Sequence, residues 1–247
     1  MPVSMEVMFY LTLGHTIPMP RVAVCMGAYN GSGYLRDLLW SLCEQTFKDF
    51  AVYIFNDGSE DDTLEVIDSF RDRLDIKVKN SKGIHNIGTV KSKVVNFALK
   101  DKPDFIQMVD SDDVLEPTFL EAMLCEIEKG FDFVVCDGVT FGDQSFPIHN
   151  EYSDKKRIIH TNPFLSWIML RAEVAKDINY RVGMGHYEDW DLHLRLLMAD
   201  KTYGIVQEPL YNYRIHPGQF HRVTEQDEFR HRVNLWEVNN INPEAPC

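Results

Sequence analysis

The sequence predicts an α/β fold in which a mostly parallel, Rossmann-like central sheet is flanked by helices. From residue 21 onward, short apolar runs rich in β-branched and aromatic residues alternate with stretches whose apolar residues recur at helical spacing. The helical stretches have the length, about 10–15 residues, of the crossovers that join parallel strands. The 247 residues, 45% of them hydrophobic, suffice for one large domain with a terminal extension.

The expected elements alternate regularly through the first half of the chain. Strands are expected at residues 21–26, 51–55, 76–78, 105–109 and 131–136. The helices between them carry, in chain order, the apolar sets Leu35, Leu38, Leu39, Leu42; Leu64, Ile67, Phe70, Leu74; Val90, Val94, Phe97, Ala98; and Leu120, Met123, Leu124, Ile127. Ser59 is expected to cap the second helix, and Pro117 suits the first turn of the fourth.

The second half is less regular, and residues 141–161 are expected to be loop-rich. Strands are expected at residues 167–170 and 210–215. Helices are expected at residues 173–177, 188–199 and 225–238. Apolar residues on one face of the helix at 188–199 are Trp190, Leu194, Leu197 and Met198. We expect all four tryptophans in the core, with stacking on a ligand as the alternative for Trp190.

Charge and cysteine usage exclude several classes of protein. A net charge of −13 makes the chain a poor partner for nucleic acid or for an anionic membrane surface. No apolar run reaches the ~18 residues of a membrane span, so at most peripheral membrane contact is expected. The five cysteines form no C-x-x-C pair and their number is odd, which favours buried reduced thiols in a cytoplasmic protein.

Three carboxylates crowd the end of the strand expected at residues 105–109. Asp110, Asp112 and Asp113 lie within four positions, and such charges repel one another unless water or a cation screens them. An isolated Asp-x-Asp is more often a solvated acidic turn. The alternative is a divalent-metal site at the mouth of the sheet, and the rest of the chain decides between the two.

Polar residues also follow two other strands of this sheet. Ala28, Tyr29 and Asn30 come after the first strand, and Asp57 comes after the second. Since ligands of open α/β sheets bind outside the carboxyl ends of the strands, these residues and the acidic cluster should line one cleft. Tyr29 can lie against a planar base, and Asp57 can accept a hydrogen bond from a base or a ribose. The sequence has no glycine-rich phosphate-binding motif, so a Mg²⁺ or Mn²⁺ ion is expected to hold a pyrophosphate.

The chain resembles the family 2 glycosyltransferases of the GT-A fold from residue 21 to about residue 219. Five motifs in the family's order carry the resemblance: RVAVCMGAYNGSGYLRDLLWSLCEQTF, VYIFNDGSEDDT, FIQMVDSDDVLEP, GHYEDWDLHLRL and YNYRIHPG. The resemblance implies an inverting, metal-assisted transfer of a sugar from a nucleotide sugar, expected to be a UDP-sugar, to an acceptor hydroxyl. The acceptor is expected to be a glycan, a lipid-linked precursor or a small molecule; the donor sugar and the oligomeric state stay open.

Carried over position by position, the resemblance implies a role for each site residue. The nucleotide-sugar contacts would be Ala28, Tyr29, Asn30, Asp57, Lys93, Asp110, Ser111, Asp112 and Asp113. The metal ligands would be Asp112, Asp110 and His216. Asp189 would be the general base, with Glu188 beside it. Two positions depart from the family pattern, since Ala28 replaces a usual proline and Val94 a common asparagine.

The same resemblance divides the chain. Residues 1–20 would be an N-terminal extension, and residues 221–247 a C-terminal helical tail. The GT-A domain would span residues 21–220, with a nucleotide-binding half at 21–137 and a smaller acceptor-binding half at 138–220.

Blander interpretations and other functions stay open at this point. Taken alone, Glu188 and Asp189 would be ordinary first-turn helix charges, and His216 a surface histidine. A sugar-nucleotide pyrophosphorylase is the second enzyme class, but it needs a basic, glycine-rich loop where this chain has MGAYNGSGY. A catalytically inactive nucleotide-sugar-binding protein is the third class, and intact Asp112 and Asp189 argue against it.

Overall fold

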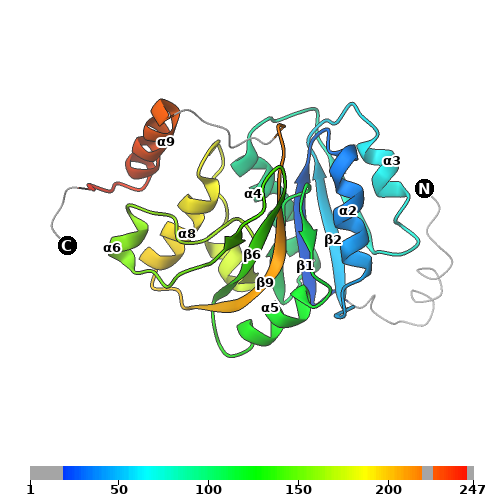
Figure 1. Cartoon of the computed structure of the whole chain (residues 1–247), viewed down its shortest axis with the longest axis horizontal. Coiled ribbons are helices and arrows are strands. Elements are labelled where there is room, and N and C mark those ends of the chain that lie inside the picture. Colours follow the sequence, from blue (N-terminus) through cyan, green and yellow to red (C-terminus); the bar gives the residue numbers. More distant parts are fainter. Residues whose placement is uncertain (1–18, 219–224, 244–247) are drawn as a thin grey trace.

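The computed structural model describes residues 19–218 and 225–243, and it has the α/β fold that the sequence predicts (Figure 1). Its sheet follows the order β3-β2-β1-β4-β8-β6-β9-β5, with β7 paired to β6. Strands β3, β2, β1, β4, β6 and β9 all run in one direction, which makes the sheet mostly parallel. The expected N-terminal extension lies outside the described residues, apart from Met19 and Pro20.

The first half is a wholly parallel layer. It consists of β1 (Val22–Ala28), β2 (Phe50–Asn56), β3 (Ile76–Asn80) and β4 (Phe105–Met108). The connecting helices are α2 (Ser32–Cys43), α3 (Thr63–Asp68) and α4 (Ile87–Ala98), with the short η1 (Leu99–Asp101) after α4. The strands, α2 and α4 match expected apolar runs or helical patterns, whereas α3 ends at Asp68, before the expected Phe70 and Leu74, and η1 was not expected.

The second half mixes directions. Strands β8 (Ile168–Arg171), β5 (Val114–Leu115) and β7 (Pro147–Ile148) run opposite to β6 (Phe133–Gly142) and β9 (Tyr203–Ile215). The helices are α5 (Phe119–Ile127), α6 (Lys155–Ile158), α7 (Ala172–Asp177), α8 (Glu188–Met198) and α9 (Glu225–Val238). The helix expected at 225–238 is therefore present with those bounds.

The core has two layers, one on each face of the sheet. Val22, Val24 and Met26 point to the face covered by α2, α3 and α5, while Ala23 and Cys25 point to the face covered by α4, α7 and α8. This alternation follows from the two-residue period of a strand. Because both faces are covered, β1 and β2 are apolar almost throughout, whereas β3 at the edge of the sheet alternates apolar residues with lysines.

Some local expectations were wrong. Ser59 does not cap a helix: its hydroxyl accepts a bond from the Asn30 N–H, and α3 begins only at Thr63. Trp40 is 43% exposed rather than buried, packed edge-on against Phe70. Met198 is also exposed. The remaining expected residues of that α8 face are buried: Trp190, Leu194 and Leu197.

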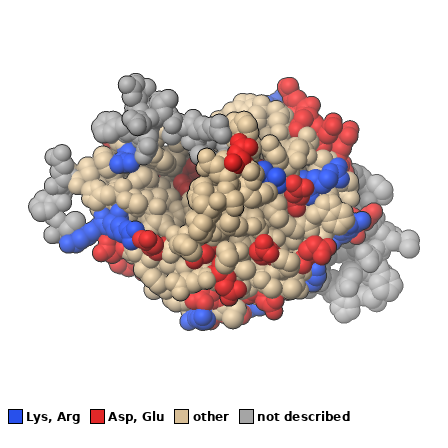
Figure 2. Space-filling model, viewed as in Figure 1, with Lys and Arg blue, Asp and Glu red and all other residues tan. Residues whose placement is uncertain are grey.

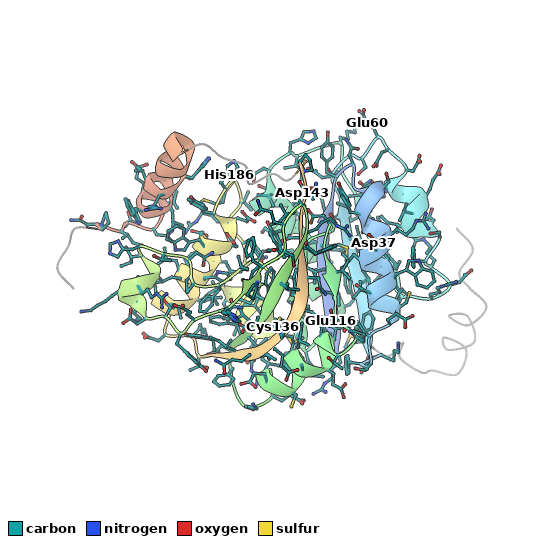
Figure 3. All side chains as sticks on the ribbon, viewed as in Figure 1. Asp37, Glu60, Glu116, Cys136, Asp143 and His186 are labelled. Atoms are coloured by element: carbon teal, nitrogen blue, oxygen red, sulfur yellow. The ribbon has the colours of Figure 1, made fainter. Side chains whose placement is uncertain are left out.

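The carboxyl ends of the parallel strands lie along one edge of the molecule, which we call the carboxyl edge. Glu60, Asp143 and His186 mark this edge at the top of Figure 3. Among the described residues, no helix is long and apolar enough to span a membrane. In the part of the chain that the structure describes, Cys25 and Cys136 are buried free thiols as expected, whereas the free thiol Cys125 is exposed.

Candidate active site

The loops after β1 and β2 are fastened to one another. Asp57 is buried, and its carboxylate accepts bonds of 2.7 Å each from the Ser81 hydroxyl, the Ile84 N–H and the His85 N–H. Asn30, in a left-handed conformation with φ 47°, accepts a bond from the Glu60 N–H through its side chain. Asp57 thus shapes the loop at residues 81–85, with lone pairs left for one more donor.

An aromatic surface lies beside Asp57. Tyr29 is 52% exposed, and its ring meets that of His85 edge-on with centroids 4.8 Å apart. Ala28 is buried at the end of β1 and carries no polar side chain toward a ligand. Two rings exposed at the carboxyl edge offer a planar base a surface to stack on.

The aspartates of the acidic cluster after β4 differ in how deeply they are buried. Asp113 is fully buried and accepts a 2.8 Å bond from the Arg214 N–H of β9. Burial, followed by the charges of Asp112 and Asp110, raises the pKa of Asp113 well above its usual range. Asp113 therefore points into the protein and holds the strand end to β9. Ser111 is half-buried beside the cluster.

Asp112 and His216 face each other across the edge. The His216 Nε2 atom lies 3.0 Å from Asp112 Oδ2, although the residues are 104 positions apart in the chain. Burial and the charge of Asp110 raise the pKa of Asp112, while His216 opposes that rise. A divalent cation here would relieve the repulsion, and a carboxylate oxygen with an imidazole nitrogen is a suitable pair of ligands.

Asp110, the third expected ligand, is occupied by protein groups. Its Oδ1 lies 3.1 Å from Lys91 Nζ, and its Oδ2 accepts a short hydrogen bond from the Ser166 hydroxyl. Among the described residues, no three His, Cys, Asp or Glu side chains are arranged as a metal site. The residues therefore fit a cation held by Asp112 and His216 alone, with substrate oxygens and water filling the other positions, as Mg²⁺ sites commonly have.

Lys91, not Lys93, meets the carboxylates. Lys91 Nζ lies 3.0 Å from Glu188 Oε1 as well as 3.1 Å from Asp110, and the residue is 4% exposed. Lys93 lies exposed on α4, and two positions along a helix place it on nearly the opposite face. The structure therefore does not bring Lys93 to the acidic cluster, near which it was expected to contact the nucleotide.

Asp189 begins helix α8 beside the cluster. Its Oδ1 accepts a 2.7 Å bond from the Trp190 N–H, and its Oδ2 lies 3.4 Å from the Asn162 amide nitrogen. Burial, followed by the charge of Glu188, raises the pKa of Asp189 to about 7, and Lys91 opposes that rise. A carboxylate with a pKa near neutrality can accept a proton from a substrate hydroxyl and later release it.

Three contacts escaped the sequence analysis. Lys91 had a recognisable signal, because it lies within the apolar face that includes Val94 and Ala98. A lysine on such a face is buried only when it is paired. Asn162 and Ser166 had no signal, because they lie in a loop whose return to the site depends on the packing of the second half.

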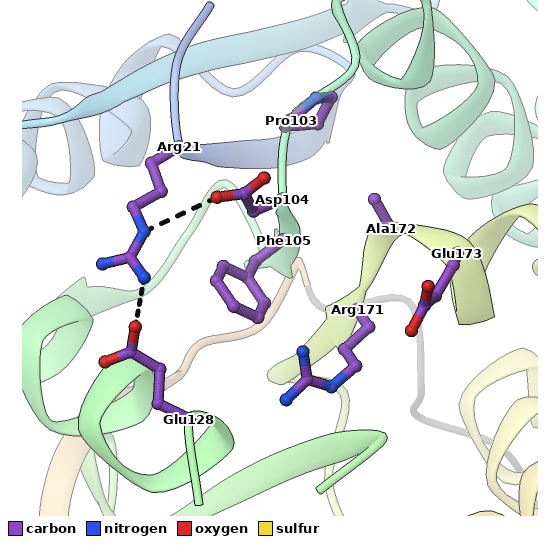
Figure 4. Close-up of a pocket in the computed structure, with 8 residues that line it drawn as sticks. All are labelled: Arg21, Pro103, Asp104, Phe105, Glu128, Arg171, Ala172 and Glu173. Carbon is purple, nitrogen blue, oxygen red and sulfur yellow. Dashed lines mark hydrogen bonds and ion pairs between the residues drawn. The ribbon is translucent and has the colours of Figure 1, made fainter. Parts of the chain in front are cut away.

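The site opens at a hollow on the molecular surface. Figure 2 shows it between the region of α8 and the end of the sheet, with an acidic side chain inside. A different cavity of 590 Å³ lies at the amino ends of β1 and β4 (Figure 4). There Arg21 pairs with Asp104 and Glu128. The chemistry-bearing residues are all at the opposite edge, so this second cavity is not the active site.

Comparisons with known proteins agree with the fold. The profile of the family described as "Glycosyl transferase family 2" matches residues 23–185. A putative glycosyltransferase of Bacillus subtilis, EpsH, is 26% identical over 89% of this chain and 68% of its own length. Staphylococcus aureus TarS, solved with UDP-GlcNAc, superposes with a TM-score of 0.75 at 20% identity, over 92% of this chain and 68% of that one.

A second solved structure extends the range of donors among the similar folds. The mannosyltransferase PcManGT of Pyrobaculum calidifontis, solved with GDP-mannose and Mn²⁺, superposes with a TM-score of 0.62 at 13% identity. The superposition covers 97% of this chain and 73% of that one. At these identities the two structures establish a common fold.

Proposed function

The chain belongs to glycosyl transferase family 2, and from that membership and the site we propose an inverting transfer of a sugar from a UDP-sugar to an acceptor hydroxyl. The carrying observation is that Asp189, a carboxyl with a raised pKa, lies at the same edge as the Asp112–His216 pair. The UDP-GlcNAc complex of TarS supports the choice of nucleotide. The acceptor class, whether a glycan, a lipid-linked precursor or a small molecule, is proposed no more narrowly.

The donor would bind along the loops after β1, β2 and β4. The Tyr29 and His85 rings would stack on the base, and Asp57 would accept its N–H or a ribose hydroxyl. Asn30 and Ser111 stay proposed contacts further along the nucleotide, as the family resemblance implies, whereas we leave Lys93 out because it lies exposed on nearly the opposite face of α4 from Lys91. We assign Asp113 to holding β9 and not to the sugar, because its side chain is fully buried.

The transfer would need one proton acceptor and one charge-stabilising group. Asp189 would take the proton of the acceptor hydroxyl while the hydroxyl oxygen attacks the anomeric carbon. The attack would come from the face opposite the leaving nucleoside diphosphate, which inverts the configuration. Asp112 and His216 would hold a Mn²⁺ or Mg²⁺ ion, which supplies stabilisation of the negative charge on the departing diphosphate.

The test is a donor screen with purified protein. UDP-sugars and GDP-mannose are incubated with Mn²⁺, and release of nucleoside diphosphate is followed with and without candidate acceptors. We expect release from a UDP-sugar, lost in Asp112→Ala and kept in Asp177→Ala, which removes an exposed carboxylate at the end of α7. Pyrophosphate-dependent formation of UTP would identify a pyrophosphorylase instead. Tight donor binding without turnover for any acceptor would identify a binding protein.

A further inference from the structure

The ammonium group of Lys91 lies between carboxylates from the two halves of the fold. Asp110 follows β4 in the first half, and Glu188 opens α8 in the second, at 3.1 and 3.0 Å from Nζ respectively. The Tyr180 ring covers a third side, with its centroid 5.6 Å from Nζ, within the range of a cation–π contact. The ammonium is therefore enclosed by protein groups.

Lys91 stays charged in this enclosure. Burial disfavours the charged form of a lysine, but two carboxylates at 3.1 and 3.0 Å from Nζ favour it, so the ammonium is held between them as an ion pair. The side chain of Lys91 is only 5% exposed, so it offers a nucleotide sugar almost no surface to bind. Its influence on the reaction has to pass through the two carboxylates that it contacts.

The backbone around Lys91 fixes the segment that leads to one of its partners, Glu188. The Gly88 N–H of α4 donates a 2.9 Å bond to the Met184 carbonyl, and the Gly183 N–H donates a 2.9 Å bond to the Thr89 hydroxyl. The first turn of α4 is thus fastened to the segment that leads into α8. A site is held best when its side chains stand on such mutually fixed elements.

We propose that Lys91 is a positioning residue for sugar transfer, which sets the spacing between the end of β4 and the start of α8 through its paired contacts with Asp110 and Glu188. The proposal rests on the proposed function, because Asp189 directly follows Glu188 and the donor would bind at the end of β4. Lys91 acts as an internal cation that joins the donor side of the site to the acceptor side.

The first test separates positioning from binding. Lys91→Met keeps the length of the side chain and removes its charge, and Lys100→Met, in the exposed part of η1, is the matched control. We expect kcat of nucleotide release to fall about 100-fold in Lys91→Met, the cost of a misplacement near 1 Å, with the donor KM unchanged. A raised donor KM with unchanged kcat would show direct donor binding by Lys91 and would overturn the proposal.

The second test asks whether Lys91 acts through Glu188. If it does, Lys91→Met combined with Glu188→Gln loses no more activity than the worse single variant, since both remove the same contact. This double variant also removes one cation and one anion together, so it is expected to fold even where Lys91→Met does not. Losses that multiply would place the two residues in independent roles and overturn the proposal.

A third measurement does not depend on turnover. Amide hydrogen exchange should be faster at residues 109–114 and 186–192 in Lys91→Met than in wild type, and unchanged there in Lys100→Met. Lys91→Arg, which keeps the cation, should retain the slow exchange of wild type. Unchanged exchange in Lys91→Met overturns the bridge whatever the activity. A wild-type protein that turns over no nucleotide sugar overturns the proposed function instead.

Discussion

Replacing Asp189 by asparagine should abolish transfer and, at the same time, make the protein more stable at neutral pH. Burial and the charge of Glu188 raise the pKa of Asp189 to about 7, so the ionised form that acts as the base is held at a cost. Asparagine keeps the size of the side chain and cannot ionise. The substitution therefore removes both the general base and the unfavourable free energy of ionising this carboxyl in the folded protein. It leaves the Asp112–His216 pair in place.

The size of the effect on rate follows from this pKa. A base with a pKa of about 7 in the free protein is about 9% ionised at pH 6 and about 91% ionised at pH 8, so wild-type kcat/KM should rise about tenfold between them. In Asp189→Asn this rise should disappear, and kcat should fall about 100- to 10,000-fold, the usual contribution of a general base. Donor binding, measured by calorimetry with UDP, should be kept.

The effect on stability has a defined sign. The unfolded carboxyl releases its proton near about pH 4, whereas the folded one holds it up to about pH 7. Between these values the folded state binds more protons than the unfolded state, so wild-type stability falls as pH rises. The melting temperature of Asp189→Asn, relative to wild type, should therefore rise from pH 4 to pH 7 and then level off.

The matched control is Asp177→Asn, which changes an exposed carboxylate at the end of α7. It should show the wild-type profile in both experiments. A pH-dependent rise in kcat/KM that survives in Asp189→Asn would refute the assignment of the base. A melting-temperature difference that stays constant from pH 4 to pH 8 would refute the raised pKa on which the reasoning depends.

Two further predictions concern the support of α8. Asp191 is fully buried and pairs with Arg181 and Arg195. Asp191→Ala should lower the free energy of unfolding, measured by urea titration, by about 3 kcal/mol, because it leaves both cations unpaired. A loss below half of that would contradict a stabilising role of these two ion pairs. In Gly88→Ala the new Cβ would lie 2.5 and 2.7 Å from two backbone carbonyl oxygens of the segment before α8. The melting temperature and the kcat of nucleotide release should therefore both fall. Gly33 has open space around it, so Gly33→Ala should lower neither.

Hydrophobic periodicity was sufficient for most of the fold and failed where one strand contains a proline. The sequence predicts a strand only from residue 210, because Pro209 ordinarily ends a strand pairing. In the structure β9 begins at Tyr203, and a register shift opposite Cys136 and Asp137 accommodates Pro209. A bulge of this kind depends on the partner strand, so no local pattern in the sequence could indicate it.

Several contacts of the site join residues that are far apart in the chain, and the sequence analysis missed them. The motifs placed Asp112 and His216 in one cleft, and the structure brings them to 3.0 Å. Lys91 was missed although its position in an apolar helix face was a usable signal. Asn162 and Ser166 contact Asp189 and Asp110 from a loop that carries no periodic pattern, and only tertiary packing brings that loop to the carboxyl edge.

The same packing sorts the acidic residues by what their oxygens already contact. Asp110 is engaged by Lys91 and Ser166, and Asp113 is buried against β9, whereas Asp57 accepts three bonds from the loop that it shapes and keeps lone pairs for one more donor. A carboxylate whose oxygens are satisfied by the protein serves mainly to fix geometry, because contact with a substrate would require breaking those bonds. The contact of Asp189 Oδ2 with the Asn162 amide nitrogen is long, at 3.4 Å, so this oxygen can exchange it for a substrate hydroxyl. We therefore expect chemistry to depend on Asp112 and Asp189, Asp57 to contact the nucleotide, and Asp110 and Asp113 to hold the site in place.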